Sequence, residues 1–178
     1  MPTNATRSAP GPKRAASRAA AVTVQVACAV RGIPPAARLR AWARAAAGGP
    51  AVLTIRLVTA GEARALNAAY RGADYVPNVL SFSYARRRAG EGAPALCGDV
   101  VLCPSVVARE AGRQGKRLEA HFAHLTVHGV LHLLGYGHAR ARAASRMERA
   151  EVRILRALGF ADPYRPAHAD SAGKMRPA

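Results

Sequence analysis

Hydrophobic and polar positions along the chain alternate between short strand-like runs and longer helix-like runs. Four short apolar segments are bounded by polar residues, proline or glycine, as β-strands are; they are residues 22–30, 51–58, 78–84 and 98–104. Five segments have the spacing of amphipathic helices; they are residues 34–48, 60–72, 105–114, 118–134 and 139–158. Strands alternating with helices before a helical C-terminal half predict an α/β (α+β) fold, with a single mixed four-stranded sheet packed with about five helices.

The 178 residues are enough for one domain with a core, and no internal repeat divides them. Periodic structure begins near residue 21 and ends near residue 164. We therefore expect a disordered basic N-terminal extension at 1–20, one domain at 21–164 and a flexible C-terminal tail at 165–178. The first 61 residues contain no acid and superficially resemble an organellar transit peptide. A disordered basic tail is the simpler interpretation.

The composition points to a polyanionic partner. Lys and Arg number 27 against 10 Asp and Glu, a net charge of +17. Such an excess attracts phosphate backbones, so nucleic acid is the leading partner class and a membrane surface is its rival. No apolar run is long enough to predict a transmembrane helix. The three cysteines form no CxxC pair, which favours a reducing, cytoplasmic location.

One predicted helix, residues 118–134, carries a stripe of histidines. On a helical wheel the four side chains fall within about 80° of one another; they are His121, His124, His128 and His132. The other faces of this helix are largely apolar, so the helix is expected to be buried. Four imidazoles in a buried stripe need polar partners. The stripe therefore indicates a site in an interior or a cleft.

The end of this helix has the spacing of a catalytic zinc site. His128 and His132 lie one turn apart, and Gly135 lets the chain turn so that His138 can approach as a third ligand. Three imidazoles with a fourth position open to water are typical of catalytic zinc. The spacing matches that of zinc peptidases, but Gly129 stands where their catalytic glutamate would be. Phosphodiester hydrolysis is therefore favoured over proteolysis.

Four blocks of sequence together resemble the YbeY family, the bacterial and organellar metal-dependent endoribonucleases of rRNA maturation. The blocks are HGVLHLLGYGH (128–138), LNAAYRGADYVPNVLSFSY (66–84), CGDVVLC (97–103) and MERAEVRILRALGFADPY (147–164). They occur in the family's order between about Val52 and Tyr164. Several blocks in register are far more specific than one metal motif.

The resemblance implies a single α/β domain with one Zn²⁺ per chain, held by His128, His132 and His138 at the end of a buried helix. Arg71 matches the family's functional arginine, and His128 is expected to take part in catalysis as well as in metal binding. A guanidinium can grip a phosphate with two hydrogen bonds. The resemblance further implies a zinc-dependent, single-strand-specific endoribonuclease in late rRNA processing, at the 3′ end of small-subunit rRNA, and in ribosome quality control. Its expected partners are single-stranded rRNA and the small ribosomal subunit, with no membrane, no DNA and a monomeric state.

Several points stay open from the sequence. The general base is either His124 or a metal hydroxide, and the nucleophile is either water or the RNA 2′-hydroxyl. Asp99 either orients a ligand histidine or caps a loop, and Asn78 and Ser81 either line the cleft or pack in a strand. Gly137 replaces the aspartate usual in the family. The alternative functions are a zinc metallopeptidase-like hydrolase and a non-catalytic, ribosome-associated RNA-binding protein.

Arginines recur along the last predicted helix and in the loop that follows the third strand. Arg146, Arg149, Arg153 and Arg156 form a stripe that either faces RNA or is simply solvated. The run at residues 86–88 would place positive charge near the cleft. Trp42 is expected in the core or at its rim, because no aromatic-rich recognition motif surrounds it.

Overall fold

The computed structural model describes residues 20–84, 96–138 and 140–165. The strands are β1 (Ala21–Val26), β2 (Ala51–Leu57), β3 (Val79–Ser83) and β4 (Leu96–Leu102). The helices are α1 (Ala36–Ala47), α2 (Ala60–Arg71), α3 (Pro104–Arg113), α4 (Leu118–Leu133) and α5 (Ala141–Ala157). Within these ranges the predicted α+β architecture is confirmed. Residues 1–19 of the predicted N-terminal extension, the arginine run at 86–88 and residues 166–178 of the predicted C-terminal tail lie outside the described residues. Ala20, the last residue of the predicted extension, is buried in the core.

The sheet is mixed, with the strand order β1-β2-β4-β3. β1, β2 and β4 run parallel, and β3 pairs antiparallel with β4. The central strand β2 buries every second side chain, as at Leu53, Ile55 and Leu57. At the edge, β1 ends at Val26, whose side chain is 58% exposed, so the predicted strand 22–30 was too long. The apolar alternation continues past the point where the ladder to β2 stops.

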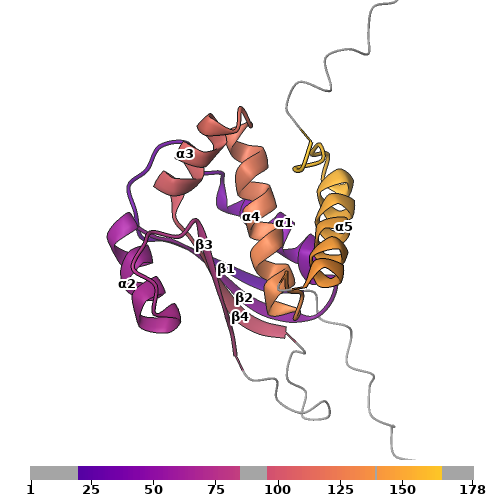
Figure 1. Cartoon of the computed structure of the whole chain (residues 1–178), viewed down its shortest axis with the longest axis horizontal. Helices are drawn as coiled ribbons and strands as arrows, with labels where there is room; N and C mark the ends of the chain where they lie inside the picture. The colour runs from indigo at the N-terminus through magenta and orange to yellow at the C-terminus, as the bar shows by residue number, and fades with distance from the viewer. Residues whose placement is uncertain (1–19, 85–95, 139, 166–178) are drawn as a thin grey trace, which may run out of the picture.

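Helices cover both faces of the sheet. Figure 1 shows α4 with α1 and α5 on one side of the sheet and α2 on the other. The larger core cluster lies on the α4 side and includes Trp42, Ile55, Val100 and Phe122. A smaller cluster, including Leu80, lies beneath α2 and α3. Trp42 is therefore a core residue, as its sequence context suggested.

A glycine lets α4 lie directly on the sheet. A Cβ atom built on Gly129 would be 2.6 Å from Val100 Cγ1 on β4 and 3.2 Å from Ser81 Oγ on β3. Ser81 Oγ also donates a 3.0 Å hydrogen bond to the Gly129 carbonyl. The position after His128 thus faces the sheet at a distance that leaves no room for a glutamate. The packing accounts for the residue that distinguishes this motif from a peptidase motif.

Within the described ranges, no helix combines the length and hydropathy that crossing a membrane requires. Cys28, Cys97 and Cys103 are all free thiols.

Candidate metal centre

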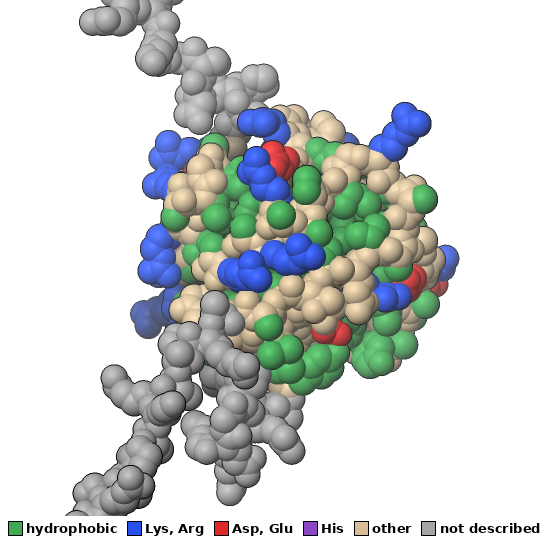
Figure 2. Space-filling model, turned by 180° about the vertical axis from the view of Figure 1, so that it is seen from behind, with side chains coloured by type: hydrophobic (Ala, Val, Ile, Leu, Met, Phe, Trp, Pro, Cys, Tyr) green, Lys and Arg blue, Asp and Glu red, His purple; other side chains and the backbone are tan. Residues whose placement is uncertain are grey.

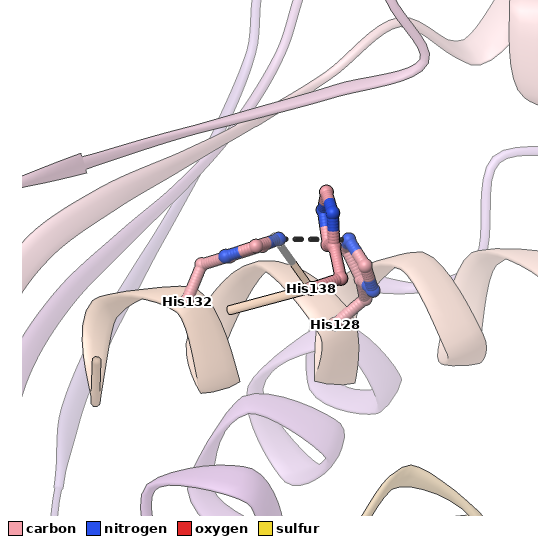
Figure 3. Close-up of side chains that lie close together, drawn as sticks. All are labelled: His128, His132 and His138. Carbon is pink, nitrogen blue, oxygen red and sulfur yellow. Dashed lines mark hydrogen bonds between the residues drawn. The ribbon is translucent and has the colours of Figure 1, made fainter. Parts of the chain in front are cut away.

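Three histidines converge where α4 ends. His128 and His132 project from adjacent turns of α4, and His138 comes from the segment that follows it (Figure 3). Gly135, with φ +87°, turns the chain so that the Tyr136 N–H donates to the Leu131 carbonyl at 3.0 Å. The three rings each offer one nitrogen, and these nitrogens all lie within 4.8 Å of one another. The structure thus brings the predicted ligand set together.

Hydrogen bonding leaves two of these imidazoles with lone pairs that face each other. His128 Nδ1 lies 2.6 Å from Glu151 Oε1, and His132 Nδ1 lies 3.0 Å from the Tyr136 carbonyl oxygen. Both Nδ1 atoms must be donors, because a carboxylate and a carbonyl only accept. The Nε2 atoms of the two rings lie 3.0 Å apart, the contact dashed in Figure 3, and this contact is a hydrogen bond only when one ring carries a second proton. With both rings neutral, two acceptors face each other. A cation between them relieves this repulsion, so the residues fit a metal ion.

The spacing of His128 and His132 and the lowered pKa of His132 suit a metal ion such as zinc. Burial lowers the pKa of His132, as do the neighbouring His128 and His138, which favours the neutral form that binds metal. Two nitrogens on one tetrahedral zinc would lie about 3.3 Å apart, given Zn–N bonds of about 2.0–2.1 Å. The 3.0 Å between His128 Nε2 and His132 Nε2 is close to that separation. A small relaxation would accommodate the ion.

Glu151 on α5 supports His128 from behind, and the sequence reasoning missed it. Its side chain is fully buried, with Oε2 accepting a hydrogen bond from the Tyr164 hydroxyl and lying 3.7 Å from His124 Nε2. Burial raises the pKa of Glu151, but the contacts with His124, His128 and Tyr164 outweigh it and lower the pKa to about 2. An ionised carboxylate here fixes the tautomer and orientation of His128. The sequence feature that could have revealed Glu151 was an acidic residue on the otherwise apolar face of α5.

Asp99 has a different role from the one considered at the metal. Its carboxylate accepts a hydrogen bond from the Tyr84 hydroxyl, and this contact is the main reason that the pKa of Tyr84 rises to about 12. The orienting carboxylate among the described residues is instead Glu151. Glu151 reaches His128 because α5 packs against α4.

A cavity of about 500 Å³ opens over the three histidines, and we call it the metal cleft. Arg71, at the end of α2, lines it, as the resemblance implied, and so does Arg109 of α3, which the sequence reasoning did not single out. The Asn78 amide donates to Glu110 Oε2 at 2.9 Å, so both side chains belong to the wall of the cleft. Two guanidinium groups thus face the same space as the candidate metal ligands.

His124 lies outside the lining of the metal cleft. Its ring packs edge-on against Tyr164, with centroids 5.5 Å apart, and against His128, with centroids 6.2 Å apart. Both of its nitrogens are buried, and neither has a hydrogen-bond partner within the part of the chain that the structure describes. Its role as a general base stays a prediction.

The fold and the histidine cluster define an α+β protein with a candidate metal centre in an arginine-lined cleft. Within that class, the sequence model described as "Endoribonuclease YbeY" matches residues 38–159. The chain belongs to the YbeY family of endoribonucleases.

Curated relatives are similar in sequence to most of the chain. Endoribonuclease YbeY of Thiobacillus denitrificans is 52% identical over 144 residues, covering 80% of this chain and 95% of the relative. That of Alkalilimnicola ehrlichii is 54% identical over 140 residues, covering 75% of this chain and 84% of the relative. The solution structure of TM1509 from Thermotoga maritima is 19% identical, with a TM-score of 0.49, covering 80% of this chain and 99% of that chain.

Proposed function

We propose that the protein is a zinc-dependent, single-strand-specific endoribonuclease, active in late rRNA processing at the 3′ end of small-subunit rRNA and in ribosome quality control. Family membership supports RNA as the substrate. The single observation that carries the metal dependence is the 3.0 Å approach of two histidine lone pairs, with His138 beside them. The domain would be residues 21–164, which contain the matched residues 38–159.

Each group in the cleft would have a distinct task. His128, His132 and His138 would hold one zinc ion, and bound zinc supplies a Lewis acid that polarises a phosphoryl oxygen and acidifies water. Arg71 and Arg109, on the wall of the same cleft, would bind the non-bridging oxygens of the phosphate and neutralise charge during transfer. Glu151 would keep His128 in the tautomer that presents Nε2 to the ion.

The wider surface supports a polyanionic partner. The face in Figure 2 carries Lys and Arg side chains at several separate places and few acidic ones, and no described histidine is visible on it. Positive charge is therefore not confined to the metal cleft. This distribution suits an RNA strand that extends beyond the phosphodiester bond being cleaved. The proposed partners are single-stranded rRNA and the small ribosomal subunit. The protein would act as a monomer in the cytoplasm.

The peptidase alternative is opposed by packing as well as by sequence. The position where a zinc peptidase has its glutamate lies against Val100 and Ser81, and any side chain there would force Val100 or α4 to shift. Within the described residues that line the metal cleft, the one carboxylate is Glu110, which accepts hydrogen bonds from Asn78 and contacts His121. A non-catalytic RNA-binding protein is the alternative that experiment must separate.

The test compares the metal content and the cleavage of single-stranded rRNA fragments for wild type, His132→Ala and Arg71→Glu. We expect wild type to carry metal and to cleave. His132→Ala should lose both properties, whereas Arg71→Glu should keep the metal and lose cleavage. If wild type carries metal and binds RNA but all three proteins cleave equally little, the non-catalytic alternative replaces this proposal. Metal-dependent proteolysis by the pure protein would favour the peptidase instead.

A further inference from the structure

A second cavity, of about 770 Å³, lies at the other end of the histidine stripe, and we call it the α4 N-terminal pocket. In Figure 1 the α3–α4 connection and the end of α5 lie at the same end of the molecule, and the pocket is formed between them. Its walls are residues 115–117, the first turns of α4, and the segment from Leu155 to Arg165. None of the candidate metal ligands lines it.

The pocket is strongly positive. Among the described residues, four cationic side chains line it against one carboxylate, that of Asp162; they are Lys116, Arg117, Arg156 and Arg165. Asp162 lies 3.4 Å from Arg156 and 3.9 Å from Arg165, both at exposed positions. The helix α4 also begins here, and its N-cap Arg117 makes no side-chain cap. Free N–H groups and the helix dipole add to the attraction for an anion.

The floor of the pocket contains buried polar atoms that lack partners. His121 is only 4% exposed; its Nε2 lies 3.0 Å from Glu110 Oε2, while its Nδ1 has no hydrogen-bond partner among the described residues. Since Nε2 donates to the carboxylate of Glu110, Nδ1 of the neutral ring is an acceptor. A buried acceptor without a donor is costly. The pocket therefore combines a cationic rim with a buried floor whose polar atoms are not fully satisfied within the described residues.

The histidine stripe connects this pocket to the metal cleft. The ring centroids of His121 and His124 are 6.3 Å apart, and those of His124 and His128 are 6.2 Å apart. The seven-residue step from His121 to His128 covers about 10 Å along the helix. The stripe itself is buried, but this separation is short enough for one single strand that passes over the surface to contact both the metal cleft and the pocket.

We propose that the α4 N-terminal pocket is a second ribonucleotide subsite, which binds a phosphate of the RNA strand at its cationic rim, above the buried His121. The subsite deepens the proposed function and rests on it for the identity of the strand. The subsite favours longer strands, because a substrate too short to extend beyond the metal cleft makes no contact with the pocket and gains no affinity from it.

The test removes charge from the rim and measures the effect on long and short RNA. The double variant Arg117→Ala/Arg165→Ala is compared with Arg31→Ala/Arg142→Ala, which removes the same charge from exposed residues outside the pocket. We expect the pocket variant to bind a single-stranded octanucleotide at least 10-fold more weakly. The slope of log K against log salt should fall in size by about 0.7, the value for one lost phosphate contact on a single strand. Cleavage of a dinucleotide should be unchanged.

A titration with uridine 5′-monophosphate and with inorganic phosphate, followed by NMR of the His121 ring, separates the two proposals. We expect the nucleotide to shift the His121 signals in wild type and not in the pocket variant, and phosphate to shift them less. If RNA is cleaved but the octanucleotide affinities of the pocket variant and wild type are equal, the subsite is overturned and the proposed function stands. If the nucleotide shifts His121 but no RNA is cleaved, the subsite stands as a nucleotide site and the proposed function falls.

Discussion

Replacing Gly129 with alanine tests whether contact with the sheet fixes α4 and its histidines. A Cβ atom at 129 would be 2.6 Å from Val100 Cγ1, where nonpolar carbons favour about 3.5–4.0 Å. One of the two must move by about 1 Å. Val100 cannot yield easily, because it is fully buried on β4, a strand paired on both sides, and its branched side chain has few rotamers.

The expected loss can be separated from helix propensity. Overpacking costs about 1–3 kcal/mol, while alanine in a helix interior gains about 0.8–1.0 kcal/mol over glycine. Gly112 on α3 is the matched control, because a Cβ atom there meets nothing within 4 Å. Gly112→Ala should therefore stabilise the protein, and Gly129→Ala should fall below it by about 1–3 kcal/mol, the overpacking cost alone.

The assay is urea unfolding in the presence of a chelator, so that metal binding does not add to the stability. Gly129→Ala combined with Val100→Ala should show a favourable coupling energy, because the second change removes the colliding methyl groups. Equal stabilisation by Gly129→Ala and Gly112→Ala would refute the close contact of α4 with the sheet. If the stability effects of Gly129→Ala and Val100→Ala were additive, the strain would not arise from contact between these two residues.

Three further predictions follow from the site. Glu151→Gln should weaken zinc binding by about 10–100-fold, measured by competition with a chromophoric chelator; unchanged affinity would show that the carboxylate does not support the metal. Burial lowers the pKa of His121 despite its contact with Glu110, so its stabilising effect is present above the unfolded-state pKa of 6.5 and is lost as the pH falls below it. His121→Gln should therefore lose less stability than wild type between pH 7.5 and pH 5 in urea unfolding, and an equal loss would contradict this. Gly137→Asp should fold normally, because a Cβ atom there meets nothing within 4 Å, and should tighten zinc binding through a carboxylate beside His138; unchanged affinity and cleavage rate would show that the missing aspartate matters little.

The parts of the fold and site that sequence predicted are those encoded locally. The metal motif has three histidines within eleven residues, around a glycine that ends a helix. This local spacing brings the three side chains together regardless of what the helix packs against. The four strands and five helices of the described ranges follow from their periodicity. The ends of strands were less predictable: β1 stops at Val26 because its ladder to β2 stops there, although apolar alternation continues to Cys28.

The groups that sequence did not reveal are brought to the site by packing between distant elements. Glu151 and His128 are 23 positions apart along the chain, and they are in contact because α5 packs against α4. Its position among Met147, Ala150 and Leu155 on the buried face of α5 was the available clue, since an acid there requires a partner. Arg109 has no such clue, because an arginine on α3 is indistinguishable in sequence from a solvated one.

The central claim is that three histidines hold one catalytic zinc ion, and a stoichiometric reconstitution tests it most directly. Zinc is added in steps to metal-free protein while the initial rate of single-stranded RNA cleavage is measured. We predict a rate that rises linearly and stops rising at one ion per chain in wild type, with no rise for His132→Ala. Full cleavage by the metal-free protein, or an equal response from His132→Ala, would contradict it.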